Sequence, residues 1–483
     1  MAAVSDFVTI VGARNTITEG SELHTYESDG LPGFRVRPAV VVLPETTEQV
    51  AACIRLAREL GMPIVPRGAG TGLSGGALPV EGCVIVGLSR MKKILDVDLA
   101  NRRMRVQPGV INLDISRHLA AAGYYYAPDP SSQSVCSIGG NVAENSGGAH
   151  CLKYGFTVNH AVGATIVTAE GEVVHIGTYG GEPDALGYDL MGVFVGSEGL
   201  LGIVTEVVIK ILRDPQATRT IFATFPTTDE AGAAVSAIIS AGIVPAAIEM
   251  MDKLAIEAIV LATHVDWPLD VGAALLMDVD GVVAEVEHTA EAAMAALRDA
   301  GALEIRSPRD EREGDLMWKG RKAAFAAMGR ISPNYYVQDG VIPRKEIVPV
   351  LRDIARLAAE AGLRVANVFH AGDGNLHPLV LYDGRIPGDE AKAEHVGGEI
   401  LKICIKYGGS ITGEHGVGFD KAAYMGDLFS EDDLATMNLV RCAFDCDGIL
   451  NPNKVFPTPR LCGDRPGVYH AHAAEVAGTA GRG

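Results

Sequence analysis

The sequence is poor in cysteine, in basic residues and in long apolar runs. Its 483 residues include 8 Cys and no C-x-x-C pair, which favours reduced thiols and argues against a Cys-ligated cluster or structural zinc. The 41 Lys and Arg stand against 60 Asp and Glu, and the formal charge of −19 argues against a nucleic-acid-binding face. Gly and Pro interrupt the longest uncharged run, residues 231–248, so we predict a buried helix and a strand there rather than a membrane span.

The N-terminal residues lack the features of a targeting segment. MAAVSDFVTI contains Asp6 and no basic stretch, which predicts no secretory signal and a cytoplasmic protein. Glycine, in contrast, is abundant, with 57 residues where a typical share of roughly 7% would give far fewer. This abundance indicates backbone segments that need a positive φ or a close approach to a ligand.

The order of apolar runs predicts an α+β protein with two large domains. Residues 1–37 form a lead-in, and residues 38–215 interleave short strands with helices. From residue 216 the order strand–helix–strand–strand–helix–strand is the split βαβ pattern of a ferredoxin-like sheet. Two apolar runs around a Gly-Asp-Gly turn then predict a hairpin, followed by helices. We expect the second domain, 216–457, to be followed by a flexible tail over 458–483.

The most glycine-rich stretch is RGAGTGLSGG, residues 67–76. Consecutive small residues let backbone N–H groups converge on an anion such as a pyrophosphate. The stretch also matches the G-x-G-x-x-G dinucleotide fingerprint and the G-x-S-x-G nucleophile elbow, but both motifs require a helix that opens at the loop. Pro79 and the strand-like run VIVGL leave no room for that helix, so we reject both motifs. A long surface turn is the remaining alternative to a phosphate-binding loop.

Two further clusters of Gly and small polar residues follow. APDPSSQSVCSIGGNVAENSGG, residues 127–148, contains two expected turns at 128–132 and 139–140. GSEGLLGIVTEVVIK, residues 196–210, runs from a Gly loop into a strand. Each cluster alone is weak evidence, but three in one domain favour a dinucleotide cradled along its length.

A group of His and Glu residues is the strongest candidate for catalysis. His370 and His377 flank the predicted hairpin turn, so their side chains can face each other across the strands. Two imidazoles and a carboxylate make an open metal site, and Glu414 in GEHG is the natural third ligand, with His415 beside it. The alternative is that the hairpin His residues are merely hydrogen-bonded. Arg321, in WKGRKAAF, offers a planar fork for a substrate carboxylate.

These segments carry a family resemblance. PRGAGTGLSGGALP, PDPSSQSVCSIGGNVAENSGG and GSEGLLGIVTEVVIK resemble the FAD-binding domain of the vanillyl-alcohol oxidase type. With HAGDGNLHP and GEHGVG, the chain resembles the FAD-linked D-2-hydroxyacid dehydrogenases over residues 38–457, and the flavin-bearing subunits of bacterial glycolate oxidases are the nearest branch. The resemblance implies a two-part FAD-binding domain, a ferredoxin-like substrate (cap) domain and a C-terminal helical segment.

The resemblance also implies which residues bind the cofactor. The residues expected to hold the FAD pyrophosphate are Pro66, Arg67, Gly68, Ala69, Gly70, Thr71, Gly72, Ser74 and Gly75. Those expected to line the flavin side are Pro130, Ser131, Gly139, Gly140, Asn141, Ser146 and Gly148, with Ile203 at the adenine end. Because residues 67–76 contain neither His nor Cys, we expect non-covalent FAD; His150 and Cys151 are the alternatives for a covalent bond.

For the chemistry, the resemblance implies a divalent ion, zinc or similar. Its ligands would be His370, His377 and Glu414, with His415 as the catalytic base and Arg321 as the anchor for the substrate carboxylate. The further candidates for substrate binding are Tyr335, Asn375 and Asn451. A Thr and a Lys of the 2-hydroxyglutarate relatives do not recur, because Phe325 and Tyr336 stand near those positions, which favours a small substrate.

We therefore expect FAD-dependent oxidation of a small 2-hydroxy acid, glycolate or D-lactate, to the 2-oxo acid by hydride transfer to flavin N5. The resemblance implies partner subunits, one of them an iron–sulfur protein, that would bring the protein to the cytoplasmic face of the membrane; a homodimer is also open. Three alternatives remain at this point: a metal-independent flavin oxidase of another alcohol or sugar, a metal hydrolase, and a non-catalytic subunit that binds FAD for stability.

Overall fold

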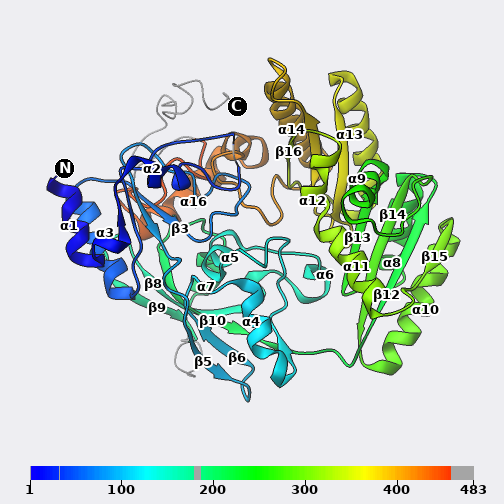
Figure 1. Ribbon diagram of the computed structural model, residues 1–483, viewed down its shortest axis with the longest axis horizontal. Coiled ribbons are helices and arrows are strands. Elements are labelled where there is room, and N and C mark those ends of the chain that lie inside the picture. The colour runs from blue at the N-terminus through cyan, green and yellow to red at the C-terminus, as the bar shows by residue number, and fades with distance from the viewer. Residues whose placement is uncertain (1, 32, 179–186, 458–483) are drawn as a thin grey trace. The chain divides into compact units, whose positions relative to one another are not determined.

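A computed structural model describes residues 2–31, 33–178 and 187–457 (Figure 1). The chain divides into two compact units. Unit 1 joins Met1–Gly147, Gly155–Arg213 and Glu414–Gly483, and unit 2 joins Gly148–Tyr154 with Asp214–Gly413. The units therefore combine distant segments: the chain passes from unit 1 to unit 2 at residues 213–214, next to the expected limit at 215, and the segment from residue 414 onward belongs to unit 1.

Unit 1 begins with a small sheet that is mostly parallel. Its strands, in spatial order, are β1 (Thr16–Ile17), β2 (Val40–Val42), β4 (Val84–Gly87) and β3 (Ile64–Arg67). The helices at this sheet are α1 (Ala2–Val11), α2 (Gly20–Leu23) and α3 (Thr47–Glu59). Thr46 caps α3, because its hydroxyl accepts the N–H of Gln49 at 3.3 Å. Val50 and Ile54 of α3 pack into the core with Val40 and Val84.

The second sheet of unit 1 is antiparallel. Its strands, in spatial order, are β5 (Ile94–Asp98), β6 (Arg103–Val106), β10 (Ile203–Lys210), β8 (Ala161–Val167) and β9 (Val173–Gly177). A two-stranded ribbon pairs β7 (Tyr124–Tyr125) with β11 (Leu212–Arg213). The helices of this part and of the C-terminal segment are α4 (Asn112–Leu119), α5 (Ile138–Glu144), α7 (Leu190–Phe194), α15 (Met425–Leu428) and α16 (Glu431–Phe444). Ile115, Ile138, Ala164 and Val207 share one core between these helices and the sheet.

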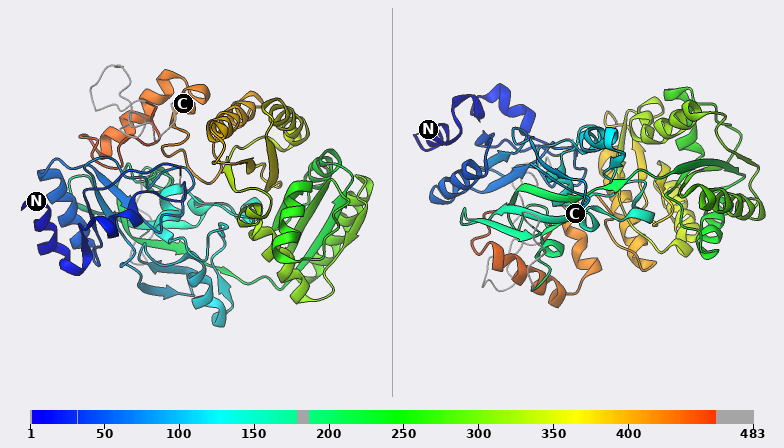
Figure 2. Two further views of the ribbon diagram at one scale, coloured as in Figure 1. Left: turned by 45° about the horizontal axis from the view of Figure 1, so that its top comes forward. Right: turned by 90° about the horizontal axis from the view of Figure 1, so that it is seen from below.

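Unit 2 is built on a seven-stranded sheet whose pairs are all antiparallel. Its strands, in spatial order, are β15 (Glu304–Arg306), β12 (Ala217–Phe225), β14 (Ala273–Gly281), β13 (Ala247–Asp252), β17 (Arg364–His370), β18 (Pro378–Tyr382) and β16 (Asn334–Val337). Its helices are α6 (Cys151–Tyr154), α8 (Thr228–Ser240), α9 (Lys253–Thr263), α10 (Val283–Asp299), α11 (Glu311–Lys322), α12 (Ala324–Ala327), α13 (Ile347–Ala361) and α14 (Asp389–Lys406). The green and yellow helices run along this sheet in the two further views (Figure 2).

The ferredoxin-like prediction is confirmed. The elements β12, α8, β13, β14, α10 and β15 follow the predicted order, with the helix α9 inserted between β13 and β14, and the hairpin β17–β18 extends the sheet beyond β13. Ile248 and Met250 of β13 face the large core under α8, α10, α13 and α14. Because side chains alternate along a strand, Glu249 points to the opposite face. The uncharged run at 231–248 forms most of α8 and the start of β13, as predicted.

The structure corrects two expectations. Gly139 and Gly140 do not form a turn: they lie in the first turn of α5, where the sequence offered no helical pattern long enough to be recognised. Cys442 is disulfide-bonded, whereas six other cysteines of the described residues are free thiols. The expected tail at 458–483 lies outside the described residues. Among the helices of the described ranges, none has the length and apolar character needed to cross a bilayer.

Candidate active site

The three Gly-rich segments meet in unit 1. A Cβ on Gly68 would lie 2.5 Å from Ser137 Oγ at the start of α5, so the loop after β3 packs directly on that helix. A Cβ on Gly199 would lie 2.5 Å from Pro66 Cγ. The N–H of Gly196 donates to Val142 O of α5 at 2.8 Å. The structure thus brings the three predicted segments together, and the first of them contains no helix, as we expected when we rejected the two motifs.

This arrangement fits a dinucleotide phosphate. A Cβ on Gly72 would meet no atom within 4 Å, so the loop faces open space at this residue. Ser137 Oγ is buried and has no hydrogen-bond partner among the described residues. Buried polar groups are normally paired, so this hydroxyl is available to a bound ligand. Asn141, predicted on the flavin side, is buried in α5 and accepts from Asn112 Nδ2 at 3.2 Å.

The lead-in segment supports the glycine loop, which the sequence did not indicate. A Cβ on Gly30 would lie 2.5 Å from Gly72 O, so no larger residue fits there. Arg67 is buried, donates to Ser28 O at 2.8 Å and lies over the Tyr26 ring. Asp29 accepts the N–H of Ala77 at 3.1 Å, and burial raises the pKa of this carboxyl group. The contacts of the Arg67 side chain are therefore mainly with the lead-in segment, residues 1–37.

Glu198 and Asn451 fasten the C-terminal segment to the same loops. The Asn451 amide donates to Gly76 O at 2.9 Å and to Glu198 O at 2.7 Å. The Glu198 carboxylate accepts the N–H groups of Val417 and Gly418, each at 2.7 Å, and burial raises its pKa. Through these contacts Asn451 supports the Gly-rich loops at residues 67–76 and 196–202. Its role in substrate binding stays a prediction. The sequence GSEGLLG did not indicate that Glu198 binds the C-terminal segment, because its hydrogen-bond partners are more than 200 residues away.

The GEHG segment is held next to the glycine loop. Ser74 Oγ donates to His415 O at 2.8 Å, and the N–H of Phe419 donates to Ser74 O at 2.9 Å. Gly416 has φ +82°, which explains the need for Gly after His415. His415 Nε2 lies 3.8 Å from Glu414 Oε1, and both side chains are largely buried.

In unit 2 the hairpin brings the two predicted His ligands together. His370 ends β17 and His377 directly precedes β18. Their ring centroids are 5.1 Å apart and the ring planes are nearly perpendicular. His370 pairs with Asn375 across the turn, so the contact between the rings comes from the turn rather than from a regular strand pair. Both His side chains are buried.

Each imidazole has a carboxylate near its Nδ1 atom. His370 Nδ1 lies 2.6 Å from Glu249 Oε1, and His377 Nδ1 lies 3.9 Å from Asp339 Oδ1. A carboxylate hydrogen-bonded at this position commonly orients a metal-binding His and leaves Nε2 with its lone pair, which applies to His370; the 3.9 Å at His377 is too long for a hydrogen bond. The donor chemistry therefore fits a divalent ion held by nitrogen ligands.

Asp339 organises the surrounding backbone. It accepts from Asn375 Nδ2 at 2.7 Å, from Thr412 Oγ1 at 2.6 Å and from the N–H of Gly413 at 3.1 Å. Gly413 directly precedes Glu414, the third predicted ligand. Asn375 is predicted to bind substrate. Its NH₂ group donates a hydrogen bond to Asp339, while its Oδ1 is buried without a hydrogen-bond partner among the described residues.

Arg321 lies on the same face of the unit 2 sheet as Glu249. It lies in the last turn of α11 and is buried, and its NH2 atom lies 2.5 Å from Glu249 Oε2. The Arg321 Nε is buried and has no hydrogen-bond partner in the described part of the chain. Burial raises the pKa of Glu249, but the charges of Arg321 and His370 outweigh it, and the net pKa is lowered. The carboxylate is consequently charged.

Three aromatic residues that the sequence singled out also lie in unit 2. Phe325 lies edge-on to His377, with ring centroids 5.7 Å apart. Tyr336 packs against Gly397 of α14, in the core. Tyr335, predicted to bind substrate, lies on the edge strand β16 and is 36% exposed. Its role stays a prediction.

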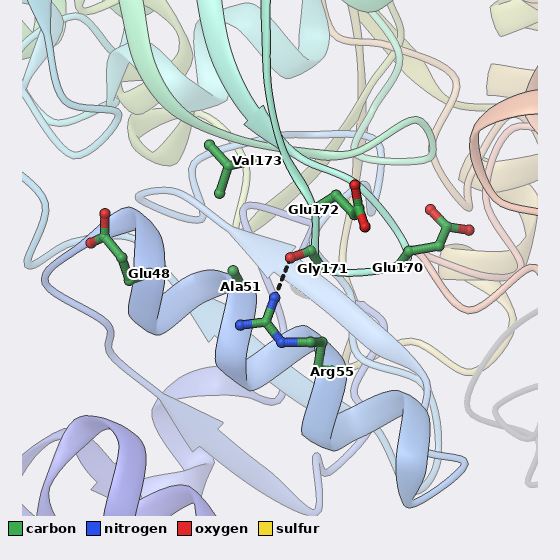
Figure 3. A pocket seen from close by; sticks show the side chains of 7 residues that line it. All are labelled: Glu48, Ala51, Arg55, Glu170, Gly171, Glu172 and Val173. Atoms are coloured by element: carbon green, nitrogen blue, oxygen red, sulfur yellow. Dashed lines mark hydrogen bonds between the residues drawn. The ribbon is translucent and has the colours of Figure 1, made fainter.

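A shallow hollow of about 310 Å³ lies on unit 1 between α3 and the turn before β9 (Figure 3). Glu48, Glu170 and Glu172 contribute to its lining, and Arg55 donates to Gly171 O. Because the cation is already bonded to the backbone and the remaining charges are acidic, the hollow offers no site for an anionic substrate.

Comparisons with known proteins agree with this geometry. Residues 38–177 match the FAD binding domain, and residues 214–455 match the C-terminal domain of FAD linked oxidases. The glycolate oxidase subunit GlcD of Escherichia coli (strain K12) is 50% identical over 93% of this chain and 90% of its own length. The chain belongs to the FAD-linked oxidase family. A D-lactate dehydrogenase of Anaerostipes hadrus is 32% identical to this FAD-linked oxidase over 92% of the chain and 95% of its own length.

Solved structures show the fold of this FAD-linked oxidase. A p-cresol methylhydroxylase with bound substrate matches with a TM-score of 0.80 at 18% identity, covering 94% of this chain and 96% of its own. At this identity the match shows a shared fold, which agrees with the predicted fold class.

Proposed function

We propose that this FAD-linked oxidase oxidises a small 2-hydroxy acid, glycolate or D-lactate, to the 2-oxo acid. The observation that carries the proposal is the buried chain Arg321–Glu249–His370, with His377 against His370. It joins a cation suited to a carboxylate with imidazoles suited to a metal. The names of the relatives, a glycolate oxidase subunit and a D-lactate dehydrogenase, support the same class of substrate.

The metal in this proposal is a divalent ion, zinc or similar, held by His370, His377 and Glu414. A bound divalent ion lowers the pKa of a hydroxyl group that it contacts. The carboxylate 2.6 Å from His370 Nδ1 supports His370 as a ligand through Nε2, and the contact between the two rings supports His377 as its neighbouring ligand. Glu414 follows the backbone group that Asp339 holds, which supports its role as the third ligand.

The remaining steps belong to this chain's own residues. Arg321 binds the substrate carboxylate and thereby orients the α-carbon, for which its unpaired Nε is available. His415 removes the hydroxyl proton, because a neutral imidazole is the side chain best suited to accept a proton near pH 7. The three Gly-rich segments hold FAD non-covalently, and FAD supplies the acceptor for the α-hydride at N5.

Phe325 is the reason for proposing a small acid. Its ring lies against His377, where a longer dicarboxylate would need a polar partner for its second carboxylate. Tyr336, near the position of the Lys in the 2-hydroxyglutarate relatives, is partly buried against the core of unit 2.

We further propose that the protein works with partner subunits. The E. coli relative is named a subunit, and the sequence contains no C-x-x-C pair typical of a cluster-binding chain. An iron–sulfur protein at the cytoplasmic face of the membrane would accept the electrons.

Anaerobic bleaching of the bound flavin tests the proposed function. The FAD-loaded protein is mixed with glycolate, D-lactate, L-lactate and D-2-hydroxyglutarate, and the flavin absorbance is followed. We expect bleaching by glycolate or D-lactate, with the 2-oxo acid formed in equal amount to the reduced flavin. The proposal fails if none of the four acids bleaches a flavin that dithionite reduces normally.

A further inference from the structure

Glu249 has an unusual place in unit 2. It is fully buried in the middle of β13, whose neighbouring residues Ile248, Met250 and Met251 are apolar. Strand pairing sets Glu249 directly opposite His370 of β17, so the two side chains share one face of the sheet. Burying a lone carboxylate is costly, and such groups persist when charged or donating partners surround them.

Both carboxylate oxygens of Glu249 are engaged, each by a different functional group. Oε1 lies 2.6 Å from His370 Nδ1, where a charged carboxylate can only accept, and Oε2 lies 2.5 Å from Arg321 NH2. An acceptor at Nδ1 fixes the imidazole as the tautomer that carries its proton there, which leaves Nε2 as a lone-pair donor. The same carboxylate keeps the guanidinium in place by charge and geometry.

We propose that Glu249 is a positioning residue that sets the tautomer of His370 for metal binding and holds Arg321 in the same network. The inference deepens the proposed function and rests on it, because it assumes the metal and the acid anchor described above. It adds that the metal ligand and the carboxylate anchor depend on one shared side chain.

The amide variant Glu249→Gln separates this role from simple packing. Gln has one acceptor oxygen and one NH₂ donor group in place of two acceptors. Since Arg321 can only donate, the amide oxygen must face Arg321 and the NH₂ group must face His370 Nδ1. His370 then has to accept at Nδ1 and carry its proton on Nε2, where it no longer binds a metal.

The double variant Glu249→Gln with Arg321→Met reverses this constraint. Without the guanidinium, the amide oxygen is free to turn to His370 Nδ1 and restore the original tautomer. A purely structural role for Glu249 predicts no such recovery. The double variant also removes both buried charges, which is commonly tolerated in folded proteins.

The test is calorimetric titration of the metal-stripped, FAD-loaded full-length protein with Zn²⁺, repeated with Co²⁺ and its visible absorption. We expect Glu249→Gln to weaken metal binding about 10- to 100-fold, as is typical when a carboxylate behind a metal-binding His is lost. The double variant should return to within a few-fold of Arg321→Met alone. Asp252→Asn, another buried carboxylate of β13 that bonds Asn367, is the matched control and should bind metal like the wild type.

The inference is overturned if Glu249→Gln binds metal as tightly as the wild type, if the double variant is as weak as the single one, or if the wild type binds no metal. Should Glu249→Gln not fold, Glu249→Asp replaces it. Its shorter side chain keeps the charge but cannot span both partners, so near-wild-type affinity would again refute the inference. Flavin bleaching by hydroxy acids is scored separately, so that failure of the proposed function and failure of this inference are distinguished.

Discussion

The hydroxyl group of Ser74 donates a hydrogen bond to the backbone carbonyl of His415 at 2.8 Å. One loop of unit 1 therefore serves two proposed purposes, since residues 67–76 are expected to hold the FAD pyrophosphate and His415 is the proposed base. Glu198 strengthens the link through its bonds to the backbone at 417 and 418. The position of the proposed base is thus built into the nucleotide cradle.

Gly72→Ala tests the cradle. Because a Cβ at this position meets no protein atom within 4 Å, the stability of the apoprotein should not change. FAD affinity should fall about 10-fold or more, which corresponds to roughly 1.4 kcal/mol of lost binding. Fluorescence titration of the apoprotein with FAD measures the change. Gly329→Ala, also in open space, is the matched control in unit 2; equal FAD affinity in both variants would refute the assignment of Gly72.

Arg321→Met should destabilise the protein strongly. The substitution leaves Glu249 as a buried charge without its cation, and breaking such a pair typically costs about 3–5 kcal/mol. Urea unfolding of the variant measures this loss. Arg309→Met is the control, because Arg309 pairs with Glu313 at an exposed position and its loss should cost far less. Similar effects of the two substitutions would contradict the importance of the buried pair.

Phe325→Thr should shift the preference of the enzyme towards longer acids. A hydroxyl beside His377 offers a hydrogen bond to a second carboxylate, and one such bond is worth about 10-fold in specificity. The measurement is kcat/KM for D-2-hydroxyglutarate relative to glycolate. Phe325→Leu keeps the site apolar and should leave the ratio unchanged, and an unchanged ratio in the Thr variant would refute the role of Phe325.

Asp252 gives a pH dependence of stability. Burial raises the pKa of its carboxyl group from 3.8 to about 6. Because the folded state holds this proton more tightly than the unfolded chain, the contribution to stability is complete below pH 3.8 and is lost as pH rises through 6. The total loss is about 3 kcal/mol. The difference in unfolding free energy between the wild type and Asp252→Asn should therefore fall from pH 4 to pH 7 and then level off; a difference independent of pH would contradict this account.

Much of the fold and part of the site could be predicted from local patterns. The glycine loop, the His370–His377 hairpin and the ferredoxin-like order each depend on residues close in sequence. Glu249, Asp339 and Glu198 could not be predicted, because each is a single acid whose partners lie far along the chain. Glu249 did leave one signal, since it is the lone charge inside the apolar run AIEMM. Only the pairing of β13 with β17 shows that its partner is His370.

The helix α5 was missed for a related reason. Its seven residues include two Gly, and Gly normally disfavours a helix interior. The close approach of Pro108 to Gly139, where a Cβ would lie 2.6 Å from Pro108 Cβ, explains why Gly is required there. Packing between distant segments thus outweighs local propensity at this point.

The most direct test of the account is the rate of anaerobic flavin bleaching by glycolate or D-lactate in three samples: the wild type, the wild type stripped of metal by a chelator, and His415→Ala. All three should retain FAD. We predict that only the untreated wild type bleaches rapidly, and that added Zn²⁺ or Mn²⁺ restores the stripped protein but not His415→Ala. Bleaching of the stripped protein or of His415→Ala at the wild-type rate would contradict the proposed roles of the metal and the base.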